Sequence, residues 1–410
     1  MKNFLKKRIS PPLLKYSYNK QLEQYRGLCA LLVLITHAVG MKNFLINDFS
    51  WPEFIHYIGA GYLSVLVFFC ISGYVIAVSN DQNLLNIKLY LKKRFIRLYP
   101  VYLITILLCV AIAKDIHISN LIGNLFFLQN DAPYWQYRIP VFVNYVTWSL
   151  NYEVFYYTLF IPLFLMRPKV WQMLLVMLLF SVILLQANSK TLIFAHYLNG
   201  YYFWIIGLFF GWKIIQGNES FDKPIPLLSM LFIQLCQNHL EIGAIILHVF
   251  NLHLNTNFNW IFDIPFCIMI MGMLTNTSNL FLKMNKIFCY TLPIVIFIYL
   301  ILHNRIFENE RWIMCLVFWI FSLLLYREKK ISALILHKLT PIGKISYSLY
   351  LLHVPVALLI KKVIFISNRP AEIIVKNLLW IAITFGLSFV LEIYFQPAVK
   401  KYFDQNLKIV

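Results

Sequence analysis

The sequence predicts an all-helical protein that crosses a membrane many times, and three of its features lead to this fold class. Of its 410 residues, 60% are hydrophobic and 13% are charged, whereas soluble domains average about 45–50% and about 25%. The mean hydropathy is +0.69. Apolar runs near the length of about 20 residues that a bilayer core requires recur along the whole chain. We therefore expect a polytopic transmembrane helical bundle with about 10–12 spans.

The apolar runs place the candidate spans one after another along the chain. They lie at 26–42, 57–79, 99–113, 143–166, 170–188, 198–213, 224–249, 260–274, 287–303, 310–326, 343–360 and 372–397. No Gly/Ser-rich linker or internal repeat separates them, so we expect one membrane domain over 26–397. A basic segment at 1–25 precedes it, and a short basic tail at 398–410 follows it.

The positive charge predicts how the chain is oriented. The net charge is +19, and 26 of the 36 Lys and Arg residues fall on one side of these spans. Cytoplasmic segments carry such an excess, which places the N-terminus and the C-terminal tail in the cytoplasm. Lys361 and Lys362 are exceptions, because they lie on the outer side. The charge thus orients the protein in a lipid bilayer, and we expect no nucleic-acid partner.

Several catalytic classes have no motif here. The sequence holds no P-loop, no G-x-S-x-G and no H-E-x-x-H. The seven cysteines lie in or beside apolar runs without a C-x-x-C spacing, which is typical of small hydrophobic residues rather than of ligands. We expect no metal.

A histidine and a glutamate lie inside two of the spans. In YRGLCALLVLITH, His37 follows Arg26 by eleven residues, which is about 16 Å along a helix. His37 is either hydrogen-bonded to a neighbouring helix or a general base. Glu153, in WSLNYEVFYY, has a similar depth. It would orient the imidazole as in a catalytic triad, or form a purely structural pair with it.

Two further stretches concentrate polar side chains. In GKISYSLYLLHVP, Ser346, Tyr350 and His353 share one helical face, which indicates either a cavity lining or hydrogen bonding between helices. In KKRFIRLYP, Arg94 and Arg97 are three residues apart. They form either a phosphate clamp, because guanidinium groups bind phosphate bidentately, or an ordinary basic flank.

Taken in order, six stretches resemble acyltransferase family 3, a family of integral membrane O-acyltransferases. They are R-x10-H (26–37), FFCISGYVI (68–76, with Ser72), KKRFIRLYPVY (92–102), WSLNYEVFYY (148–157, with Ser149 and Tyr152), FWIIGLFFG (203–211) and GKISYSLYLLHVP (343–355). One block departs from the pattern, because Glu392 and Pro397 are five residues apart where E-x-P is expected. No appended periplasmic esterase-like domain is expected.

The resemblance implies an acyl transfer. The acyl group, most often acetyl, would pass from cytoplasmic acetyl-CoA to a hydroxyl of an envelope or exported polysaccharide: an O-antigen, a capsule or an exopolysaccharide. The enzyme would lie in the bacterial cytoplasmic membrane. His37 and the arginines Arg26, Arg94 and Arg97 are the residues that the resemblance makes important.

On this hypothesis the arginines hold the phosphates of coenzyme A, and His37 either deprotonates the sugar hydroxyl or carries the acyl group itself. Ser149, Tyr152 and Tyr350 are candidate oxyanion donors, and Ser72, Ser346 and His353 are candidate pocket residues.

Two other classes of protein remain open from the residues alone. A transporter or flippase for a lipid-linked glycan or a small anion would also use buried His and Glu. A scaffold for an envelope synthase would use them for packing only. The oligomeric state and the acceptor sugar are not predicted.

Overall fold

A computed structural model describes residues 20–80, 85–130, 138–166, 168–187, 192–216, 224–251 and 259–406. It is 82% helical and has no strand among these residues, which confirms the all-helical class. Most of the predicted basic N-terminal segment, 1–19, and the last four residues of the tail, 407–410, lie outside the described residues.

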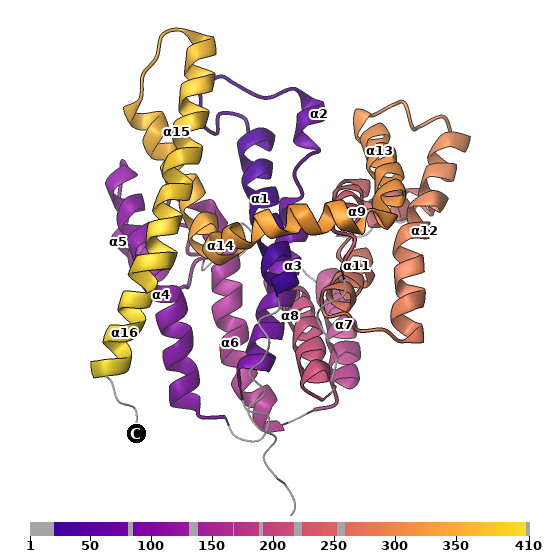
Figure 1. Cartoon of the computed structure of the whole chain (residues 1–410), viewed down its shortest axis with the longest axis horizontal. Coiled ribbons are helices and arrows are strands. Elements are labelled where there is room, and N and C mark those ends of the chain that lie inside the picture. Colours follow the sequence, from indigo (N-terminus) through magenta and orange to yellow (C-terminus); the bar gives the residue numbers. More distant parts are fainter. Residues whose placement is uncertain are drawn as a thin grey trace, which may run out of the picture.

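The helices follow one another along the chain (Figure 1). The α-helices are α1 (Lys20–Gly40), α2 (Glu53–His56), α3 (Gly61–Ser79), α4 (Ile87–Ile112), α5 (Ile118–Leu125), α6 (Trp148–Met166), α7 (Val170–Ala187), α8 (Leu192–Gln216), α9 (Leu227–Leu240), α10 (Ile242–Val249), α11 (Asn259–Leu274), α12 (Leu280–Leu302), α13 (Glu310–Leu324), α14 (Lys329–Val363), α15 (Arg369–Val390) and α16 (Gln396–Asn406). Short 3₁₀ turns form η1 (Tyr145–Thr147) and η3 (Leu325–Arg327), and η4 (Leu391–Phe395) is a π-helix.

Fewer helices meet the requirements of a membrane span than the sequence predicted. Among the described residues six are long and apolar enough, or seven if α9 and α10, which meet at a bend of 40°, count as one span. The remaining predicted spans include short helices, such as α11 with 16 residues and α13 with 15. A straight span needs about 20 residues, so these two are too short by that measure.

The basic stretch at 88–97 is helical and belongs to α4. Pro100 lies inside this helix and has no N–H to donate to the carbonyl of Ile96. The side chain of Gln396 donates to that carbonyl instead. This bond replaces the missing helical one, so α4 continues through the proline, as apolar surroundings require.

Two glycines bring α1 and α14 into close contact. A Cβ on Gly343 would lie 2.0 Å from the backbone oxygen of Glu23, and a Cβ on Gly27 would lie 2.7 Å from the backbone nitrogen of Gly343. Close approach through small residues is typical of membrane helices. One turn earlier, Gln24 donates to Thr340 at 3.0 Å. The two helices therefore run parallel with a constant offset of 316 residues.

α3 and α8 pack in the same manner. A Cβ on Gly73 would lie 1.9 Å from the backbone oxygen of Trp204, and a Cβ on Gly207 would lie 1.7 Å from that of Cys70. Only glycine fits at these two positions. The packing fixes the polar residues of α3 relative to the rest of the bundle.

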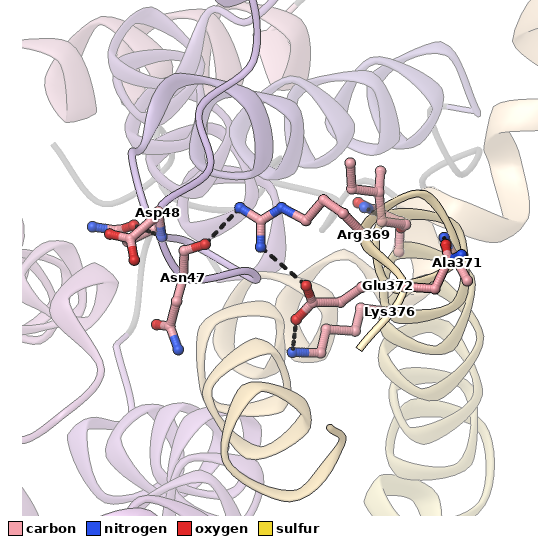
Figure 2. Close-up of polar contacts among 10 residues, drawn as sticks. Asn47, Asp48, Arg369, Ala371, Glu372 and Lys376 are labelled. Carbon is pink, nitrogen blue, oxygen red and sulfur yellow. Dashed lines mark hydrogen bonds and ion pairs between the residues drawn. The ribbon is translucent and has the colours of Figure 1, made fainter. Parts of the chain in front are cut away.

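Positive charges hold the loop after α1 in place. Lys361 donates to the backbone oxygen of Asn43 at 2.7 Å, and Arg369 donates to that of Asn47 at 2.7 Å. Figure 2 shows Arg369 also paired with Glu372, which in turn pairs with the buried Lys376.

Lys362 has a comparable role at the end of α4. Its ammonium group donates to the oxygen of Ile112 at 3.2 Å, where the carbonyls of a helix C-terminus favour a cation. Both lysines that depart from the predicted charge distribution thus bind nearby backbone carbonyls.

Candidate active site

A narrow cavity of about 130 Å³ lies where α1, α3, α4, α6 and α14 meet. Eight of the eleven site residues predicted from the sequence line it: Arg26, Ser72, Arg94, Arg97, Ser149, Glu153, Ser346 and Tyr350. The rest of the wall is mostly apolar. Three arginines in one small cavity make it suited to an anionic ligand. His37, His353 and Tyr152 do not line it.

Arg94 has unused hydrogen-bonding capacity. Its guanidinium lies over the rings of Tyr90 and Tyr157, at 5.8 and 5.7 Å from their centroids. Its Nε atom is buried and has no hydrogen-bond partner among the described residues. A buried donor without a partner is costly, and a bound acceptor would satisfy it.

Arg97 is already neutralised by a carboxylate. Its Nη1 atom lies 2.6 Å from Oε2 of Glu392, a side chain that is 4% exposed. The other carboxylate oxygen accepts from the backbone and the hydroxyl of Ser348, at 3.2 and 3.1 Å. The structure thus gives Glu392, whose part the sequence left in doubt, a defined contact within the π-helix η4. Single π turns are frequent at functional sites.

Glu153 is bound by two hydroxyls of the cavity wall. Ser72 donates to its Oε1 atom at 2.7 Å, and Tyr157 donates to the same atom. The prediction that Glu153 orients His37 is therefore wrong. Its carboxyl group lies in the wall of the cavity that the three arginines also line.

His37 is paired with a second histidine instead. Its Nδ1 atom lies 2.9 Å from Nε2 of His353, and Nδ1 of His353 lies 2.7 Å from the backbone oxygen of Tyr350. The parallel register of α1 and α14 creates this pair, because the two residues share the offset of 316. His353 has no exposed surface.

These contacts fix the protons of both rings. A carbonyl only accepts, so Nδ1 of His353 carries a proton, and its Nε2 accepts because a fully buried imidazole without an anionic partner is neutral. His37 must then donate from Nδ1. Its Nε2 atom consequently keeps a lone pair, which is what a general base requires.

Tyr145 is a neighbour of His37 that the sequence reasoning missed. Its ring meets the imidazole edge-on, with 5.3 Å between centroids. Its hydroxyl is buried and unpartnered among the described residues. In the sequence, Tyr145 could have been found from its position three residues before Trp148, where the WSLNYE stretch begins.

The remaining predicted hydroxyl groups differ in whether they have a hydrogen-bond partner among the described residues. Ser149 and Tyr350 bond to each other at 2.8 Å, and Tyr350 also donates to the oxygen of Val146, so both hold α6 against α14. Ser346 is 1% exposed, and its hydroxyl has no partner among the described residues. Tyr152 stacks on Tyr197 away from this cavity, with 4.2 Å between centroids.

Comparison with known proteins identifies a family for the chain. A family model described as an acyltransferase domain matches residues 19–396, which is nearly the whole chain. No curated protein and no solved structure matches the chain.

Proposed function

The chain belongs to acyltransferase family 3 and is a multi-pass membrane acyltransferase, and on this premise we propose what it transfers and how. The acyl group, most often acetyl in this family, comes from cytoplasmic acetyl-CoA. The acceptor is a hydroxyl of a cell-envelope or exported polysaccharide, and the enzyme lies in the bacterial cytoplasmic membrane. The observation that carries the proposal is the His37–His353 pair beside a cavity lined by three arginines.

The cavity suits the donor. Arg94, whose Nε atom lacks a partner, binds a phosphate of coenzyme A together with Arg26. Arg97 helps less directly, because Glu392 compensates its charge. The small volume of the cavity favours the pantetheine arm and a short acyl chain, with the nucleotide outside. The open hydroxyl of Ser346 is available to an amide of that arm.

The chemistry follows from the lone pair on Nε2 of His37. This nitrogen removes the proton of the acceptor hydroxyl while the hydroxyl oxygen forms a bond to the thioester carbon. The carbon–sulfur bond then breaks, and the proton passes to the thiolate to give free coenzyme A. The hydroxyl of Tyr145 donates to the oxyanion. Transfer through an acyl-histidine would use the same lone pair.

The experiment compares envelope polysaccharide from three strains by NMR. The first strain makes the native protein, the second makes the His37→Ala variant in the same amount in the membrane, and the third makes neither. We expect O-acyl signals only with the native protein, since loss of a general base costs about 10²–10⁴-fold. Identical O-acyl signals in all three strains would contradict the proposal and favour a carrier or scaffold.

A further inference from the structure

A second and larger cavity, of about 750 Å³, lies between α3, α6, α8, α9, α10 and α11. Its volume falls within the range of about 300–1,000 Å³ that small-molecule sites occupy. It shares one residue with the arginine-lined cavity, Phe69, which lines both. The two cavities are therefore neighbours separated by a thin wall.

The WSLNYE stretch of α6 faces both cavities. Ser149 and Glu153, four residues apart, line the first one, and Trp148 and Tyr152, also four apart, line the second. Residues with that spacing share a helical face. The same helix turn thus connects the two cavities, and Tyr145, just before it, contacts His37.

The chemistry of the second cavity differs from that of the first. No Lys or Arg is among its described lining residues, so it lacks the groups that bind phosphate. Aromatic rings such as Trp148 and Trp260 alternate with amides such as Asn199 and Gln237. Aromatic faces pack against apolar C–H surfaces, whereas amides both donate and accept hydrogen bonds.

Three polar side chains that line this cavity have unused hydrogen-bonding capacity. Trp260 is 6% exposed, and its Nε1 atom has no partner among the described residues. The Oδ1 atom of Asn199 is likewise buried and unpartnered. Asp263 is 5% exposed, and its carboxylate accepts from Gln237 at 3.1 Å, which leaves lone pairs unused. One donor and two acceptors with unused hydrogen-bonding capacity thus belong to residues that line a single cavity.

We propose that this second cavity binds the acceptor as an uncharged sugar residue, an inference that rests on the proposed function. A sugar ring presents C–H faces to Trp148 and Trp260, and its hydroxyls both donate to Asp263 and Asn199 and accept from Trp260. Phosphate and other anions are disfavoured, because no Lys or Arg is among the described residues that line this cavity. The donor then enters one cavity and the acceptor the other, on either side of Phe69.

The test uses purified protein in lipid nanodiscs and two readouts. The probe is a set of oligosaccharides released from the envelope polysaccharide of cells that lack the protein. Its affinity is measured without acyl-CoA by isothermal calorimetry, and that of acetyl-CoA is measured separately. We expect Trp260→Phe to weaken oligosaccharide binding about tenfold, the loss of one hydrogen bond to a buried group, and to leave the affinity for acetyl-CoA unchanged.

A matched control is Trp204→Phe. Trp204 is also buried with an unpartnered Nε1 atom, but it lines neither cavity. The Trp204→Phe variant should bind the oligosaccharides and acetyl-CoA with the affinities of the native protein. Asp263→Asn, which keeps the shape of the side chain, should weaken oligosaccharide binding as well.

Three results are informative. Oligosaccharide affinity that is equal in the native protein, Trp260→Phe and Asp263→Asn overturns the proposal, and so does a loss that Trp204→Phe shares. Native protein that binds the oligosaccharides through Trp260 but transfers no acyl group to them supports the sugar site and contradicts the acyl-transfer function alone.

Discussion

At the residue scale, the partner of His37 determines which of its nitrogens can act as a base. His353 accepts from Nδ1 of His37 and leaves Nε2 free. A carboxylate in this position would also stabilise an imidazolium, whereas a neutral imidazole only orients the ring. His353 is therefore a positioning residue, and it acts through the tautomer of His37.

The first prediction tests this tautomer. His353→Phe removes the acceptor, so His37 is free to carry its proton on Nε2, and we expect kcat to fall about 10²-fold or more. The KM for acetyl-CoA should not change. His353→Gln supplies a carbonyl oxygen that can accept from Nδ1 of His37 and should recover part of the rate. Steady-state kinetics in nanodiscs measure both values. A Phe variant with native kcat would refute the positioning role.

A second prediction distinguishes the roles of the two arginines of α4, Arg94 and Arg97. Arg94→Ala removes the guanidinium that we propose to bind a phosphate of coenzyme A, so we expect the KM for acetyl-CoA to rise about tenfold or more, with little change in the melting temperature. Arg97→Ala leaves the buried carboxylate of Glu392 unpaired, so its main effect is a lower melting temperature.

The double variant Arg97→Ala, Glu392→Gln is the control for this assignment. An amide at 392 can still accept from Ser348 without burying a charge, so the melting temperature should partly recover. Thermal unfolding of the purified proteins measures this. A double variant no more stable than Arg97→Ala would show that the ion pair is not what holds α4 to η4.

At the scale of helices, the parallel contact of α1 and α14 builds the site. Gly27 and Gly343 allow the backbones to meet, and the same register brings His37 to His353 about three turns further on. The geometry of the base therefore depends on two residues that take no part in the chemistry.

The third prediction follows from this contact. Gly343→Ala places a methyl group 2.0 Å from the backbone oxygen of Glu23, so α14 must move away from α1. We expect a lower melting temperature and a kcat reduced together with it. Gly40→Ala is the matched control, because a Cβ on Gly40 meets nothing within 4 Å. Equal activity of the two glycine variants would contradict the dependence of the site on this register.

At the scale of the whole molecule, the sequence predicted the class of fold and eight of the residues that line the first cavity. Hydropathy along the chain predicted helices because apolar runs of near-spanning length have few other solutions in a membrane. Local motifs predicted the lining residues, since neighbours on one helical face reach the same cavity. Arg94 and Ser346 were found in this way.

What the sequence could not predict are relations between helices far apart in the chain. The His37–His353 and Arg97–Glu392 pairs depend on the register of helices about 300 residues apart. Among the described residues, six or seven helices have the length and composition of a span, fewer than the about 10–12 predicted, because hydropathy alone does not show where a helix bends or ends, as between α9 and α10. The second cavity is lined by residues of six helices, and no single motif indicated it.

The most direct test of the central claim measures acyl transfer by the purified protein. Free thiol released from acetyl-CoA is followed in nanodiscs with and without the envelope oligosaccharides, for the native protein, His37→Ala and a control, His303→Ala, whose histidine lies at the end of α12 outside both cavities. We expect acceptor-dependent release from the native and His303→Ala proteins and a loss of about 10²-fold or more in His37→Ala. Equal acceptor-dependent release from all three would contradict a catalytic role for His37.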